Sequence, residues 1–238
     1  MEQFQSRHVQ TQEEWEISMC HKVLDFIKEE LYLDLRFLKA AFGALTVRPD
    51  ASVSAFATDG QFLSFSSEQI LRVFKNNPRY LERAYLHSVL HCIFGHLWIG
   101  GKRDRTQWNL ACDIAVEYTI DRMNKPCTKR ILSWIRQKTY QELESEKNGI
   151  SAAIIYRYLY GKKPEEIVAL QKEFYTDDHR YWPVEEEKQA ARESVGKQWD
   201  KIARQTKMEQ EMRGDETEDG EEVLAAQLRA EKSRRSYT

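Results

Sequence analysis

One stretch of the chain, residues 80–98, constrains the fold more than any other. It reads YLERAYLHSVLHCIFGHLW and holds three of the six histidines of the protein. Asn77 and Pro78 precede it, and this pair is typical of a helix start, with Asn at the N-cap and Pro at the first helical position. In such a helix His87 and His91 lie one turn apart on the same face. We therefore expect the chain to be organised around this helix.

The spacing of these two histidines predicts a metal site. Two imidazoles at positions i and i+4 are the arrangement with which the H-E-x-x-H helix holds one zinc ion. Here the run reads HSVLH, so Ser88 stands where that motif has a glutamate that accepts a proton from metal-bound water. The sequence thus offers most of a Zn²⁺ site and lacks the usual general base.

Two residues are candidates for the third metal ligand. Asp113, on a helix predicted over residues 107–123, is favoured because a carboxylate inside an otherwise apolar helix needs a partner. Glu117 lies one turn further along the same face, where it either orients a histidine or replaces the missing base. His96 is the alternative ligand, and it reaches the other histidines only if Gly95 breaks the helix.

The residues around this helix predict a mostly helical α+β fold. Apolar residues at helical spacing indicate a long helix over residues 11–42, broken at most once. A small sheet precedes the histidine helix, with Asp59 and Gly60 as the turn of a β-hairpin. The expected strands are residues 45–47, 53–57 and 61–65. Further helices are expected at residues 66–74, 131–140, 151–160 and 164–175.

The composition changes after Pro183. Residues 185–212 form a highly charged helical stretch with few apolar positions. We therefore place a compact domain at residues 12–183 and predict that residues 184–238 form a charged helical extension or linker.

Composition and charge exclude several classes of protein. The net charge of -2 gives no reason to expect nucleic acid or an anionic membrane as a partner. No window holds the roughly 18 or more consecutive apolar residues of a membrane span, and the polar N-terminus is unlike a signal peptide. The four cysteines include no C-x-x-C pair, so we expect reduced thiols in a cytoplasmic protein.

Four runs of residues, taken together, resemble a bacterial protein family. They are ATDG at 57–60, HSVLH with the following GH at 87–96, WNLACD at 108–113, and DDH with a nearby Trp at 177–182. Over about residues 20–183, their order and spacing resemble the N-terminal zincin-like domain of bacterial metallopeptidases that carry a C-terminal von Willebrand factor A-like domain. Members typically show H-E-x-x-H-x-x-x-G-H, then W-N-x-A-x-D, then D-D-H.

The resemblance implies roles for individual residues. His87 and His91 would bind zinc, and the aspartate of the second motif falls on Asp113. The general base of the family falls on Ser88, where this sequence departs from the pattern. A second departure is Glu117, where the family often has Asn.

The D-D-H run makes Asp178 and His179 further candidates for the site. The family also implies functional coupling to an AAA+ ATPase of the MoxR type. The chain ends about where the A-like domain of the family would begin.

Three functions follow from the missing glutamate. The first is a zincin-like metal-binding domain that has lost peptidase activity and binds a protein or peptide, because a serine hydroxyl does not titrate near neutral pH. The second is an active zinc peptidase with Glu117 as its base. Such an enzyme needs a substitute for the missing glutamate, because loss of a general base lowers the rate by about 10²–10⁴-fold. The third is a helical structural domain without metal.

Overall fold

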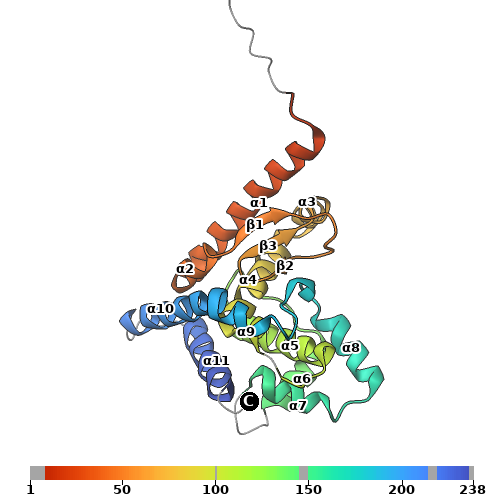
Figure 1. Ribbon diagram of the computed structural model, residues 1–238, viewed down its shortest axis with the longest axis vertical. Helices are drawn as coiled ribbons and strands as arrows, with labels where there is room; N and C mark the ends of the chain where they lie inside the picture. Colours follow the sequence, from red (N-terminus) through yellow and green to blue (C-terminus); the bar gives the residue numbers. More distant parts are fainter. Residues whose placement is uncertain (1–8, 100, 145–149, 214–218, 236–238) are drawn as a thin grey trace, which may run out of the picture.

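The computed structural model describes residues 9–99, 101–144, 150–213 and 219–235, and Figure 1 shows its ribbon. These residues form a mostly helical structure with one three-stranded sheet, which confirms the predicted α+β class. Helix α1 (Gln12–Asp34) begins with a capping box, in which Thr11 and Glu14 each bond the other's backbone N–H. The predicted long helix is broken after α1, and a 3-10 turn leads into α2 (Lys39–Phe42).

The sheet consists of three short strands in the order β1-β3-β2. Strands β2 (Ala57–Thr58) and β3 (Phe62–Phe65) form the predicted antiparallel hairpin, whose turn contains Gly60 at φ 91°. Strand β1 (Thr46–Pro49) pairs with β3 in parallel.

The strand predicted over residues 53–57 is wrong for most of its length. Only its last residue belongs to β2, and the rest forms a loop. The physical reason is a competing partner, because the carbonyl oxygen of Phe56 accepts a hydrogen bond from the N–H of Asp178 at 2.7 Å. This bond ties the loop to the D-D-H segment.

Helix α4 (Pro78–Phe94) is the histidine helix, and it follows α3 (Ser67–Asn76). The side chain of Asn77 accepts the N–H of Tyr80, and Pro78 is the first helical residue, as predicted. The helix is shorter than predicted because Gly95 adopts the left-handed conformation at φ 70°, and a 3-10 turn then carries residues 96–98. Every residue from Leu81 to Phe94 is buried, so α4 is the centre of the core.

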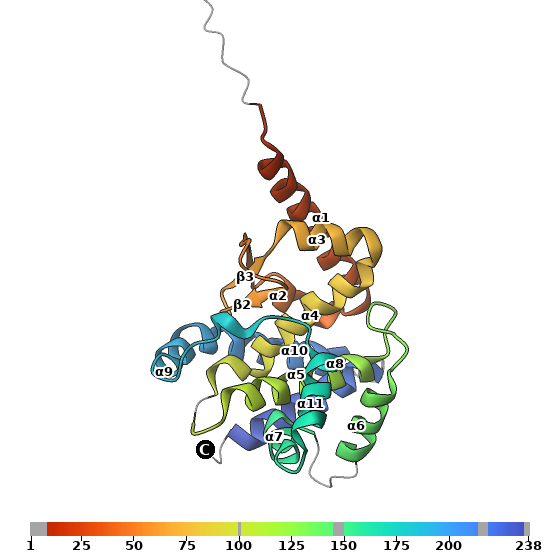
Figure 2. The same cartoon turned by 90° about the vertical axis from the view of Figure 1, so that its right-hand side faces the viewer.

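The other helices surround α4. Figures 1 and 2 show α1, α3 and the sheet on one side of it and the later helices on the other. Asp104 caps the start of α5 by accepting the N–H of Gln107. The helices that follow α4 are α5 (Arg105–Met123), α6 (Trp134–Glu144), α7 (Ala152–Leu159) and α8 (Pro164–Phe174).

Residues after Pro183 also contribute to this core. They form α9 (Lys188–Ala191), a π turn, α10 (Lys197–Arg213) and α11 (Asp219–Arg235). Helix α10 contacts α2 and α4, and α11 contacts α5. Their few apolar residues include Trp199, Leu224 and Leu228, all buried in the same cluster as α4. The domain boundary at residue 183 stays a prediction, but the described part of this segment is packed.

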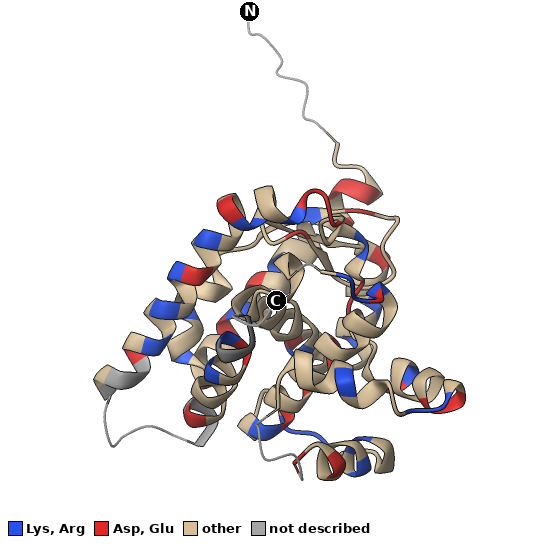
Figure 3. Cartoon of the chain, turned by 60° about the horizontal axis from the view of Figure 1, so that its bottom comes forward, with Lys and Arg blue, Asp and Glu red and all other residues tan. Residues whose placement is uncertain are grey.

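Charge is spread over the helices. Lys and Arg alternate with Asp and Glu along the ribbon in Figure 3, in keeping with the small net charge. Among the described helices, none combines the length and the apolar character that crossing a bilayer requires.

Candidate metal centre

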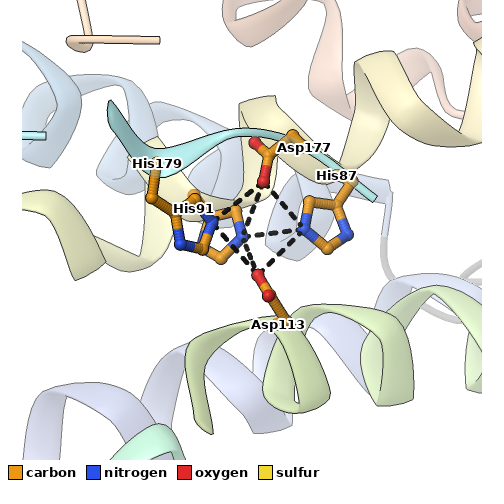
Figure 4. A group of neighbouring side chains, drawn as sticks. All are labelled: His87, His91, Asp113, Asp177 and His179. Carbon is orange, nitrogen blue, oxygen red and sulfur yellow. Dashed lines mark hydrogen bonds and ion pairs between the residues drawn. The ribbon is translucent and has the colours of Figure 1, made fainter. Parts of the chain in front are cut away.

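Five buried side chains converge beside α4. His87 and His91 come from α4, Asp113 comes from α5, and Asp177 and His179 come from the segment after α8. Each residue offers one ligand atom, and these five atoms lie within 4.8 Å of one another. Figure 4 shows the five side chains directed toward a common point. The cluster therefore has the residue types, burial and convergence of a metal site.

The distances within the cluster are short. The two Nε2 atoms of His87 and His91 are 2.8 Å apart. Asp113 Oδ1 lies 3.4, 3.2 and 3.1 Å from Nε2 of His87, His91 and His179. Asp177 Oδ1 lies 2.9 Å from His179 Nε2 and 3.5 Å from His87 Nε2.

Three of these ligand atoms are buried and lie close to other atoms of the cluster, but make no well-directed hydrogen bond to any described residue. They are Asp113 Oδ1, Asp177 Oδ1 and His179 Nε2. Buried polar atoms are nearly always paired, because leaving one unpaired costs about 1–3 kcal/mol. A cation bound between them would supply the missing partner.

A second layer of side chains fixes the orientation of His87. Its Nδ1 lies 2.8 Å from Glu117 Oε1. A carboxylate only accepts, so Nδ1–H donates to it and Nε2 faces the cluster. Glu117 also accepts hydrogen bonds from Arg83 at 2.9 Å and Arg136 at 2.7 Å. Burial raises the pKa of Glu117, but Arg83, His87 and Arg136 outweigh it and hold the pKa below its usual range.

Glu117 therefore lies behind His87, with its oxygens engaged by two arginines and the imidazole. Of the two roles predicted for Glu117, this geometry favours the orienting role. The other role, that of surrogate base, finds no support, because neither oxygen faces the ligand atoms.

His91 is oriented through His96. The Nδ1 atoms of these two rings are 3.0 Å apart, and His96 Nε2 lies 3.6 Å from Glu231 Oε1 on α11. A proton on Nδ1 of His91 leaves its Nε2 free for the cluster. The turn at Gly95 brings His96 behind His91, so the predicted alternative ligand supports a ligand and is not itself in the cluster.

The structure also shows the contacts of Ser88 and of the residues in the D-D-H run. Ser88 Oγ is fully buried and donates to Asp177 Oδ2 at 2.8 Å. Asp178, a predicted candidate, lies outside the cluster and accepts from the N–H and Nε of Arg180 at 3.0 and 2.7 Å. His179, the other candidate of this run, lies within the cluster.

Asp177 is the site residue that sequence reasoning missed. Asp178 has extended backbone angles, φ -109° and ψ 117°. Side chains alternate sides in an extended segment, so Asp177 and His179 share one side and Asp178 takes the other. Treating the D-D-H run as extended would have paired Asp177 with His179.

A cavity of about 450 Å³ opens over the cluster. Asp113, Asp177 and His179 line its floor, and Arg105 and Asn109 from the first turns of α5 are among its other lining residues. Structural metal sites are closed, whereas sites that bind a further ligand keep one side open. The cluster borders this cavity through Asp113, Asp177 and His179, although its ligand atoms are themselves buried.

Glu231 connects the C-terminal helix to the centre, and its removal should weaken metal binding. Its carboxylate accepts from the N–H of Ala152 at 2.8 Å and from Gln227 at 3.0 Å, and it faces His96. We expect Glu231→Ala to lower metal affinity by about 10–100-fold, as loss of such outer residues typically does. Calorimetric titration with Zn²⁺ measures this effect. Exposed Glu222 on the same helix is the control, and equal affinities for the two variants would contradict the assigned role.

No family model, no curated protein and no solved structure matches this chain. The resemblance to the zincin-like family thus stays a prediction. What the centre does is argued below from its own geometry.

Proposed function

We propose that this chain binds one divalent metal ion at the cluster and uses it to hold a ligand in the adjoining cavity, without hydrolysing it. The observation that carries the proposal is the set of five converging, buried ligand atoms. Asp113 and Asp177 give the cluster a charge of about -2 when the three imidazoles are neutral. A divalent cation balances that charge, and buried carboxylates need such a partner.

The residues around the cluster fit a metal ion. Glu117 and His96 hold His87 and His91 with Nε2 toward the centre, as the outer partners of metal-bound imidazoles do. When bound, the ion would supply a Lewis-acid position facing the cavity. Zn²⁺ is the ion that the family resemblance suggests.

In the part of the chain that the structure describes, neither position 88 nor Glu117 offers a free carboxylate base, and this argues against hydrolysis of the zincin type. The position of the motif glutamate is Ser88, whose hydroxyl is engaged by Asp177. Glu117 is engaged by arginines on the far side of His87. A centre without a positioned base loses about 10²–10⁴-fold of rate. The resemblance supplies the class of ligand, a protein or peptide, and adds a MoxR-type ATPase as one candidate partner.

A metal-dependent hydrolase is the second candidate function, and the open cavity favours it. An assay of the metal-loaded protein with labelled casein separates the two. We expect no hydrolysis above a metal-free control. Turnover that disappears in His91→Ala would favour the hydrolase.

Metal affinity should rise with pH, and this dependence tests the proposal. Burial lowers the pKa of His179, but Asp113 and Asp177 outweigh it and raise the pKa to about 9. Burial likewise opposes charge on His87, yet Asp177 and the other nearby carboxylates raise its pKa well above the usual value. Burial, followed by the charge of His87, lowers the pKa of His91 to about 3.

The raised pKa values of His87 and His179 favour protonation of the metal-free cluster, and a metal ion must compete with those protons. Affinity should therefore rise as the pH increases toward 9, the pKa region of His179, and protons should be released as the ion binds. Zn²⁺ titrations at pH 6, 7 and 8 in two buffers of different ionisation enthalpy measure both quantities. Affinity that does not change with pH would contradict this account, and absence of binding at any pH would overturn the proposed function.

A further inference from the structure

The cluster contains more potential metal ligands than a tetrahedral zinc site uses. Catalytic zinc sites have three protein ligands, and structural ones have four. His87, His91 and Asp113 already make up the three-ligand set predicted for a zincin. Asp177 and His179 are two additional donors, and both are buried.

A hydrogen bond holds Asp177 in the orientation of a metal ligand. Its Oδ2 accepts the hydroxyl of Ser88, which leaves Oδ1 directed at the imidazoles of His87 and His179. Ser88 is fully buried between α4 and this carboxylate. A glutamate at the buried position 88 would bring a second carboxylate against Asp177. The serine that removes the expected base therefore also makes room for Asp177 and orients it.

His179 is equally well fixed. Its ring stacks on Trp182, with the centroids 3.8 Å apart and the planes 21° apart. The backbone N–H of Asp178 bonds Phe56, and Arg180 donates to the carbonyl oxygen of Ser52 at 2.8 Å. These contacts tie both sides of His179 to the loop before β2, so its imidazole is positioned and is not a loosely held surface group.

The separations between the ligand atoms agree with neighbouring ligands of one ion. Ligands at right angles around an ion, with bonds of about 2.1 Å, lie about 3.0 Å apart. Asp113 Oδ1 lies 3.1 to 3.4 Å from all three imidazoles, and Asp177 Oδ1 lies 2.9 Å from His179. Both carboxylates thus have histidines as close neighbours, as adjacent ligands of one ion would.

We propose that all five side chains bind a single ion, which keeps one further position open to the cavity. Three imidazoles and two carboxylates, with no thiolate, form a mixed nitrogen and oxygen set that suits Fe²⁺ or Mn²⁺ in six-fold coordination. This inference rests on the proposed metal-binding function. It changes the expected cofactor from tetrahedral Zn²⁺ to a six-coordinate ion.

Cobalt substitution tests the number of donors without any assay of activity. Four-coordinate Co²⁺ absorbs strongly in the visible range, whereas six-coordinate Co²⁺ absorbs weakly. The full-length protein, stripped of metal and loaded with one equivalent of Co²⁺, should give the weak spectrum. His179→Ala should bind Co²⁺ more weakly and absorb more strongly as the coordination number falls. His21→Ala, which changes a half-buried histidine of α1 outside the cluster, should match the wild type.

Each outcome of this experiment has a definite meaning. A strong four-coordinate spectrum from the wild-type protein overturns the five-donor inference and leaves the metal-binding function intact. Failure to bind Co²⁺, Mn²⁺, Fe²⁺ or Zn²⁺ overturns both. If His179→Ala does not fold, X-ray absorption of the Co²⁺-loaded wild type counts the ligands directly. A count of four or fewer then contradicts the inference.

Discussion

The His87→Ala variant should lose metal binding and, with it, the stabilisation that metal gives the wild-type protein. His87 Nε2 faces four other ligand atoms, and Glu117 holds its ring in that orientation. An ion that binds only the folded state stabilises it by about 4 kcal/mol at a free concentration 1,000 times its Kd. Thermal melting with and without metal should therefore show a clear rise of Tm for the wild type and none for the variant.

His21→Ala is the matched control for this prediction. His21 is half-buried on α1 and packs edge-on against Phe65, far from the cluster in the chain. Its variant should keep the full metal-dependent rise of Tm. An equal rise in His87→Ala would show that metal stabilises the protein from another place.

Arg136→Met should be strongly destabilising even without metal. The guanidinium is buried and donates to Glu117 at 2.7 Å, to Asp121 at 3.0 Å and to Glu173 at 2.8 Å. Its removal leaves buried carboxylates short of a counter-charge, and breaking a buried pair in this way costs about 3–5 kcal/mol. We expect roughly 3 kcal/mol, the lower end of that range, because Arg83 remains paired with Glu117 and Asp121. Urea unfolding of the metal-free proteins measures the difference.

Arg122→Met provides the comparison for that variant. Arg122 pairs with Glu144 on the surface, where both side chains are more than a third exposed. Exposed ion pairs contribute about 0–1 kcal/mol. Similar losses for the two arginines would mean that the buried network does not stabilise the fold as described.

Local signals predicted much of the fold. Asn77 and Pro78 marked the start of α4, and Asp59 with Gly60 marked the hairpin. These signals succeed because a cap or a turn depends on only a few neighbouring residues. The strand at residues 53–57 was wrong because its hydrogen bonds go to a segment over 100 positions away, which no local pattern reveals.

The residues of the candidate site also fall into two groups, those with a local sequence signal and those placed by tertiary packing. Helical spacing predicted His87 and His91 as metal ligands, and Asp113 was predicted because it is a carboxylate in an otherwise apolar helix. Asp177 and Glu231 reach the site only through tertiary packing, from the segment after α8 and from α11. Asp177 lies in a loop of polar and aromatic residues and Glu231 lies in a highly charged segment, and neither pattern indicates that the carboxylate is buried. Long-range contacts of this kind lie beyond periodicity and motif spacing.

The hydrogen bond between Ser88 and Asp177 joins residues 89 positions apart in the chain. A bound ion would reinforce this junction and tie α4, α5 and the segment at residues 177–179 into closed loops. The four cysteines of the protein are free and buried, so no disulfide stabilises this fold. The metal would then act as a removable cross-link of the native state, which it stabilises through its binding free energy and not through the entropy of the unfolded chain. Availability of the ion would thereby control how long the native structure persists.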